Sequence, residues 1–76
     1  MELQSFIKNF AGQFENTDES LFEANTMFHD LDEWSSLIAL AIIAMVDEEY
    51  DVALKGDEMR NAQTIEDLFA FVKAKQ

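Results

Sequence analysis

The sequence predicts one all-α domain, a small bundle of four helices of which three are longer and one is short. Apolar residues recur at spacings of three and four along residues 2–14 and 65–72, as they do on the core-facing side of a helix. Between these segments, the ten residues from Leu37 to Val46 include no polar or charged side chain. Because the chain has only 76 residues, residues 1–76 are expected to form a single domain with a modest core.

The first helix is predicted over residues 2–14, and a long loop follows it. No glycine or proline interrupts this segment before Gly12. Its core-facing stripe consists of Leu3, Phe6, Ile7, Phe10 and Phe14. The loop begins with polar and acidic residues, among which Leu21 and Phe22 form a local anchor. Further apolar side chains are expected to hold the rest of the loop against the helices: Met27, Phe28, Leu31 and Trp34.

The second helix is predicted to begin at two adjacent serines. Ser35 and Ser36 stand directly before the apolar run, and serine is a preferred residue at the N-terminus of a helix. Ten apolar residues are too few to span a bilayer, so the segment indicates a helix of about four turns that ends near Tyr50. Its broad core side contains Ile38, Ile42, Ile43, Met45, Val46 and Tyr50.

The opposite side of this helix carries a second apolar strip, formed by Leu37, Leu40, Ala41 and Ala44. The acidic residues Asp47 and Glu48 lie at the far end of the strip. An uncovered apolar strip beside an exposed serine hydroxyl would form a docking surface for a partner. The same composition also fits a helix that is buried on all sides.

A short helix and a longer helix complete the chain. Residues 56–61 are predicted to form one short helical turn after the breaker Gly56. Thr64 then caps the last helix, because Thr64 and Asp67 have the spacing of a capping box and the helix dipole favours acidic residues in the first turn. The inward face of this helix consists of Ile65, Leu68, Phe69 and Val72.

The composition argues against several classes of function. Sixteen acidic and five basic residues give a net charge of -11, which repels nucleic acids and anionic lipid surfaces and attracts basic partners. The chain has no cysteine and opens with no basic and apolar leader. The acidic cluster of Asp30, Asp32 and Glu33 lacks the central glycine and the spaced terminal glutamate of a calcium loop. We therefore expect a cytoplasmic monomer that binds no nucleic acid, membrane or metal.

The segment Asp32-Glu33-Trp34-Ser35-Ser36-Leu37, with the apolar helix that follows it, resembles the Asp-Ser-Leu region of acyl carrier proteins and of related peptidyl and D-alanyl carrier proteins. The resemblance extends over nearly the whole chain. In that family the serine before the leucine receives 4'-phosphopantetheine, so the resemblance implies attachment at Ser36. The aspartate that usually precedes this serine is replaced by Ser35, which leaves Ser35 as the alternative attachment residue.

The resemblance implies a non-catalytic carrier. A phosphopantetheinyl transferase (a holo-synthase) would attach the arm from coenzyme A. The thiol of the arm would then hold an acyl or aminoacyl group as a thioester for the loading and accepting enzymes of fatty-acid, polyketide or nonribosomal peptide biosynthesis. Fatty-acid-type carriers have acidic residues in the first half of the second helix, where this chain has apolar ones. Docking is therefore expected to depend on Trp34, the apolar strip, Asp47 and Glu48.

Two other functions also fit the residues. An acidic interaction module would use the apolar strip to hold a partner helix or a basic protein without covalent modification. A small serine hydrolase would need Ser36 as nucleophile together with Asp30 and the only histidine, His29. The chain has no glycine near Ser36 of the kind found in a nucleophile elbow. The sequence identifies neither the cargo nor the pathway.

Overall fold

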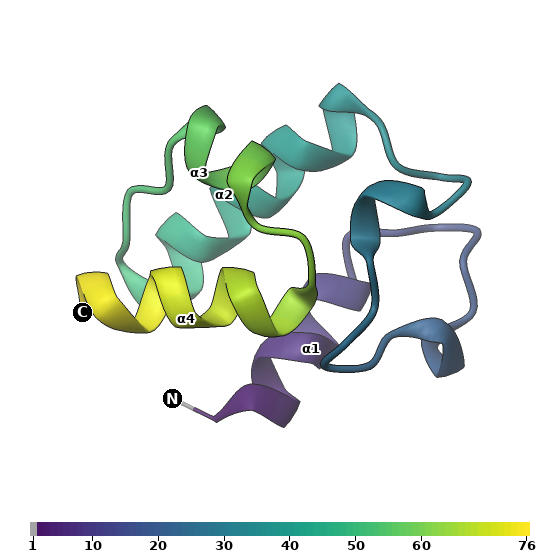
Figure 1. Ribbon diagram of the computed structural model, residues 1–76, viewed down its shortest axis with the longest axis horizontal. Coiled ribbons are helices and arrows are strands. Elements are labelled where there is room, and N and C mark those ends of the chain that lie inside the picture. Colours follow the sequence, from purple (N-terminus) through teal and green to yellow (C-terminus); the bar gives the residue numbers. More distant parts are fainter. Residues whose placement is uncertain (1) are drawn as a thin grey trace.

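The computed structural model describes residues 2–76, which contain four α-helices and two 3-10 helices (Figure 1). The α-helices are α1 (Leu3–Ala11), α2 (Ser36–Tyr50), α3 (Gly56–Asn61) and α4 (Ile65–Lys75). The 3-10 helices, η1 (Glu19–Leu21) and η2 (Phe28–Asp30), lie in the loop between α1 and α2. The predicted all-α bundle with three longer helices and one short helix is confirmed. No helix in residues 2–76 has the length and hydropathy needed to cross a membrane.

Helix α1 ends earlier than the sequence predicted. Its last residue is Ala11, and the next residues form a turn in which the N–H groups of Gln13 and Phe14 donate back to carbonyls of α1. Phe14 is still buried, because this turn keeps its ring on the core side. There it packs on Phe22, with the two ring centroids 4.9 Å apart. The spacing of the phenylalanines thus predicted the burial correctly but made the helix too long.

An aromatic cluster joins the long loop to α1. Phe10 is fully buried, and its ring centroid lies 5.6, 6.1 and 5.4 Å from those of Phe14, Phe22 and Phe28. Tilted and edge-to-face arrangements of this kind are the ones that aromatic pairs prefer. Through Phe28, the cluster holds η2, and with it the segment that leads into α2, against the core.

Helices α2 and α4 supply half of the buried non-aromatic residues of the core. The buried residues of these two helices are Ile42, Met45, Val46, Ile65, Leu68 and Val72. Four residues of α2 and α4 that were predicted to face the core are only partly buried, namely Ile38, Ile43, Tyr50 and Phe69, and the same is true of Leu3 in α1. Tyr50 stays at the edge of the core because its hydroxyl accepts a hydrogen bond from the Asn9 side chain at 2.9 Å.

Backbone hydrogen bonds hold the second half of the loop. Met27 and Thr64 form an isolated antiparallel bridge, and the N–H of Glu66 donates to the carbonyl of Ala24 at 2.9 Å. The predicted side-chain anchors Phe22 and Phe28 are buried, and Leu31 and Trp34 are partly buried. Leu21 and Met27, by contrast, are 57% and 46% exposed, so the prediction that they anchor the loop is wrong. Met27 instead holds the loop through its backbone, which forms the bridge to Thr64.

The chain after α2 follows the sequence prediction closely. Asp51 ends α2 in the left-handed conformation (φ 57°), and α3 covers the predicted residues 56–61. The capping box of α4 is formed, since the Thr64 hydroxyl accepts the N–H of Asp67 at 3.1 Å and the Asp67 carboxylate accepts the N–H of Thr64 at 3.2 Å. Glu58 of α3 forms an ion pair with Lys75 of α4 at 2.9 Å, which joins the two helices.

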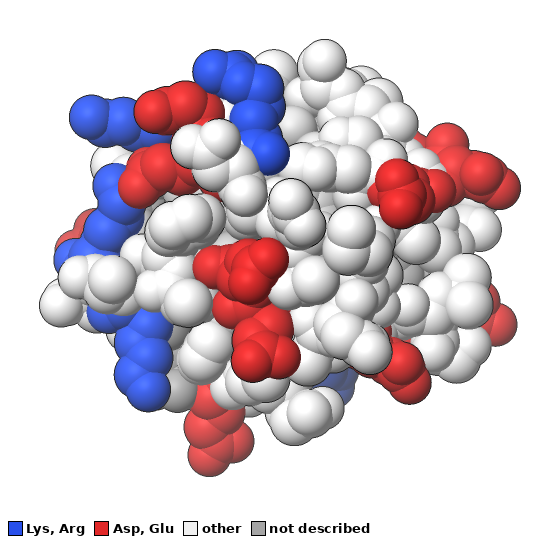
Figure 2. All heavy atoms as spheres, viewed as in Figure 1, with Lys and Arg blue, Asp and Glu red and all other residues white. Residues whose placement is uncertain are grey.

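Charge is unevenly distributed along the chain. Residues 1–50 include eleven acidic residues and one basic residue, whereas residues 51–76 include five acidic and four basic residues. In Figure 2 most of the basic side chains gather at the end of the molecule where α3 and the C-terminal end of α4 lie in Figure 1. The acidic side chains are spread over the whole of the same face, and some of them lie among the basic ones. The N-terminal two thirds of the chain therefore carry nearly all of the net negative charge.

Candidate functional site

The two serines at the start of α2 have different roles. Ser35 is the N-cap: its backbone is extended (φ -157°, ψ 170°), and its Oγ accepts the N–H of Ile38 at 3.3 Å. Ser36 is the first residue of α2, and its side chain is exposed. None of the hydrogen bonds within residues 2–76 uses the Ser36 hydroxyl. This hydroxyl lies beside the N–H groups of the first helical turn, where the helix dipole favours an anion.

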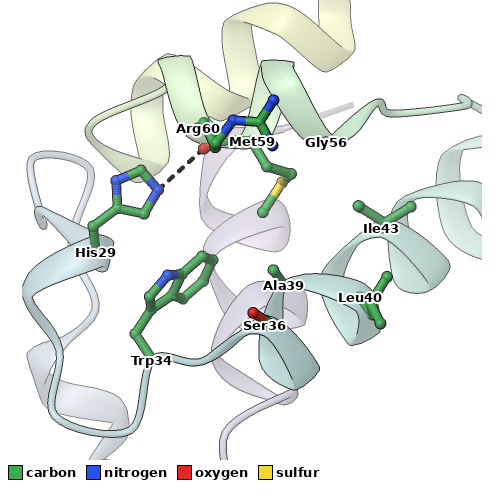
Figure 3. Close-up of a pocket in the computed structure, with 9 residues that line it drawn as sticks. All are labelled: His29, Trp34, Ser36, Ala39, Leu40, Ile43, Gly56, Met59 and Arg60. Atoms are coloured by element: carbon green, nitrogen blue, oxygen red, sulfur yellow. Dashed lines mark hydrogen bonds between the residues drawn. The ribbon is translucent and has the colours of Figure 1, made fainter.

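Ser36 also lines a pocket between α2, α3 and the loop that precedes α2 (Figure 3). We call it the Ser36 pocket and define it by His29, Trp34, Ser36, Ala39, Leu40, Ile43, Gly56, Met59 and Arg60. Its volume is about 660 Å³, which falls within the range of small-molecule sites.

Trp34 and His29 form the loop side of the pocket. The Trp34 ring centroid lies 5.0 Å from that of Phe28 and 5.2 Å from that of His29, so the indole packs on the aromatic cluster while it faces the pocket. His29 Nε2 donates a hydrogen bond to the Met59 carbonyl at 3.1 Å, which links η2 to α3 (Figure 3). Because a carbonyl oxygen can only accept, this bond fixes the proton on Nε2.

The geometry around Ser36 contains no hydrogen-bonded catalytic relay. Nε2 of His29 is already bonded to Met59, and Figure 3 shows the Trp34 ring between His29 and Ser36. Asp30 lines a different hollow, on the side of the molecule that includes Thr17. In the described part of the chain no hydrogen bond joins Ser36, His29 and Asp30. The hydrogen bond that His29 makes therefore holds η2 and α3 together and does not involve Ser36.

The second apolar strip of α2 is open to solvent. Leu37 and Leu40 are 76% and 62% exposed, Ala44 is exposed, and Ala41 is half-buried. The acidic residues at its far end, Asp47 and Glu48, are exposed as well. The alternative in which α2 is buried on all sides is therefore wrong. Since Leu40 also lines the Ser36 pocket, the strip and the pocket adjoin.

Glu33 closes the start of the long loop. Its carboxylate accepts the N–H groups of Glu15 and Asn16 at 2.9 and 3.0 Å and the hydroxyl of Thr17 at 2.7 Å. The Thr17 hydroxyl, followed by the Glu15 N–H, holds the pKa of Glu33 below its ordinary value because both bonds stabilise the charged carboxylate. The sequence grouped Glu33 with an acidic loop, whereas the structure gives it a specific role in loop closure.

The α3 side of the pocket was missed by the sequence analysis. It consists of Gly56, Met59 and Arg60, of which Met59 is buried and Arg60 is exposed. Their spacing of three and four residues does place them on one face of a helix. Nothing in the sequence, however, indicates that this face lies opposite the start of α2.

Comparisons of this chain with family models, with curated proteins and with solved structures give no match. A functional proposal must therefore rest on the residues themselves. Two features of the chain bear on its function: the exposed hydroxyl of Ser36 at the start of α2, and the adjoining apolar strip and pocket, which share Leu40.

Proposed function

We propose that this protein is a carrier that receives 4'-phosphopantetheine on Ser36 and holds acyl or aminoacyl groups as thioesters. The observation that carries the proposal is the division of roles between the two serines. Ser35 uses its hydroxyl to cap α2, whereas the hydroxyl of Ser36 is exposed and makes no bond that the helix needs. Modification of Ser36 therefore leaves the cap intact, and modification of Ser35 would remove it.

The start of α2 suits a covalently attached phosphodiester. Its negative charge would lie beside backbone N–H groups that no carbonyl of the helix accepts and at the positive end of the helix dipole. The thiol at the end of the arm supplies the nucleophile that this cysteine-free chain lacks. In this proposal the chain itself positions the arm, and the transferase and the loading and accepting enzymes carry out the chemistry.

The exposed strip of α2 supports docking of partner enzymes close to the arm. Leu37 is adjacent to Ser36 in the sequence, and Leu40 lies one turn further along the helix. The acidic Asp47 and Glu48 would pair with basic residues of a partner. The same strip also favours the second candidate, an acidic interaction module that holds a partner helix without covalent modification.

The intact mass of the protein tests the proposal. The chain is incubated with coenzyme A, magnesium and a broad-specificity phosphopantetheinyl transferase, alongside Ser35→Ala and Ser36→Ala. We expect the wild type and Ser35→Ala to gain one phosphopantetheine each and Ser36→Ala to gain none. Ser35→Ala is the matched control, because it removes the neighbouring hydroxyl. If no protein is modified by two transferases of different specificity, although all three are folded, the carrier proposal fails and the interaction module is favoured.

A further inference from the structure

Arg60 places a positive charge at the rim of the Ser36 pocket. Figure 3 shows its side chain running back along α3 above the pocket, toward Gly56. The guanidinium lies over this glycine, because a Cβ atom added there would be 3.6 Å from Nη1 of Arg60. Within residues 2–76 no carboxylate forms an ion pair with the guanidinium, and the one ion pair of α3 is that of Glu58 with Lys75. Arg60 is thus an unneutralised cation beside a pocket of an acidic protein.

Below the guanidinium the pocket is apolar and aromatic. Met59 is only 2% exposed and forms its floor, Ile43 and Ala39 are half-buried, and the Trp34 ring forms its side (Figure 3). A small hydrophilic anion such as phosphate would leave these apolar surfaces unfilled. A neutral hydrocarbon would leave the Arg60 charge without a partner. Only a ligand with an apolar body and an anionic end would contact the apolar lining and also pair with the charge of Arg60.

We propose that the Ser36 pocket binds an aromatic carboxylic acid without covalent attachment. The carboxylate pairs with the planar fork of Arg60, which matches its two oxygens. The aromatic ring lies between Trp34 and Met59, where ring–ring and sulfur–ring contacts are favourable. Because the chain has a net charge of -11, an anion without such a partner would be repelled, so Arg60 decides whether an acid can enter.

A fluorescence titration tests this inference directly, because Trp34 is the only tryptophan of the chain and lines the pocket. The unmodified full chain is titrated with 3-phenylpropionate and with 3-phenylpropanamide, which has the same body and no charge. We expect a saturable change with both ligands and an affinity about fivefold higher for the acid, the factor given by one exposed ion pair. The result does not depend on whether Ser36 is modified in the mass experiment.

Two variants of Arg60 test whether its charge causes the preference for the acid over the amide. Arg60→Gln should remove the preference for the acid over the amide, and Arg60→Lys should keep part of it. Lys73→Gln is the matched control, because it removes the same charge from an exposed residue of α4 outside the pocket, and it should keep the full preference. Circular dichroism confirms that each variant is folded.

Three results would overturn the inference. The first is a wild-type protein that gives no saturable signal or binds acid and amide equally well. The second is a preference for the acid that survives in Arg60→Gln. The third is hexanoate binding as tightly as 3-phenylpropionate, which would show that the pocket selects an acid but not an aromatic one.

Discussion

Helices α1 and α2 are both rich in apolar residues, yet they bury different fractions of their length. Four of the nine residues of α1 are buried, against three of the fifteen residues of α2. α1 has polar residues such as Lys8 on its outer side, whereas α2 has no polar residue from Leu37 to Val46 on either side. The apolar content of a helix therefore does not by itself show how many of its residues are buried in the core. The surplus on α2 is exposed to solvent, on a chain with a net charge of -11.

The largest effect is expected at the centre of the aromatic cluster. Phe10→Ala removes a fully buried ring that packs on three others, so we expect the free energy of unfolding to fall by about 3–5 kcal/mol. Urea denaturation followed by Trp34 fluorescence measures this loss. A decrease below about 1 kcal/mol would show that the core does not depend on α1 in this way.

The two sides of α2 can be compared with one pair of variants. Ile42→Ala removes a fully buried side chain and should lower the free energy of unfolding by about 2–4 kcal/mol. Leu40→Ala truncates a side chain that is 62% exposed and should change it by no more than about 0.5 kcal/mol. The same urea denaturation applies to both. Similar losses in the two variants would contradict the assignment of Leu40 to a surface that folding does not use.

A smaller difference is expected between the two serines. Ser35→Ala removes the N-cap bond to Ile38 and should cost about 1 kcal/mol of stability. Ser36→Ala removes a hydroxyl that α2 does not use and should cost no more than about 0.5 kcal/mol. Thermal denaturation of the two variants gives the comparison. A larger loss for Ser36→Ala would mean that Ser36 is mainly a structural residue.

The smallest effect concerns the loop after α1 and depends on pH. Because the folded-state pKa of Glu33 lies below its ordinary value of 4.5, its contribution to stability is present above pH 4.5 and is lost as the pH falls through the lowered pKa. NMR chemical shifts of the Glu15 and Asn16 amide protons should report this titration with a midpoint below 4.5. Glu33→Gln should abolish it. A midpoint at or above 4.5 would contradict the loop closure by Glu33.

Features set by neighbouring residues were predicted well from the sequence. The bounds of α3 and the capping box at Thr64 and Asp67 depend on residues a few positions apart, and both are confirmed. The apolar strip of α2 followed from helical spacing, but whether it was exposed did not, since that depends on which elements cover it. The sequence also predicted α1 to be too long. The spacing of Phe14 indicates that its side chain is buried, but it does not show whether the residue belongs to the helix or to the turn after it.

The parts of the candidate site that were not predicted depend on contacts between distant residues. The bond from His29 to the Met59 carbonyl joins residues 30 positions apart, and the bonds of Glu33 reach back 16 to 18 positions. The choice of Ser35 as the cap depends on the direction in which the loop enters α2. These hydrogen bonds and the choice of cap cannot be predicted from periodicity in the sequence, because each depends on the path of the loop over the core.

Helix α3 gives the Ser36 pocket one wall that is easily displaced. α3 has six residues and is the shortest α-helix of the described chain, with only Met59 buried among them. α3 keeps its shape through the burial of Met59, the bond from His29 and the ion pair of Glu58 with Lys75. We expect these few contacts to make α3 a segment of low local stability, which opens while α1, α2 and α4 stay packed. A displacement of this one short helix would change the volume of the Ser36 pocket without unpacking the other three.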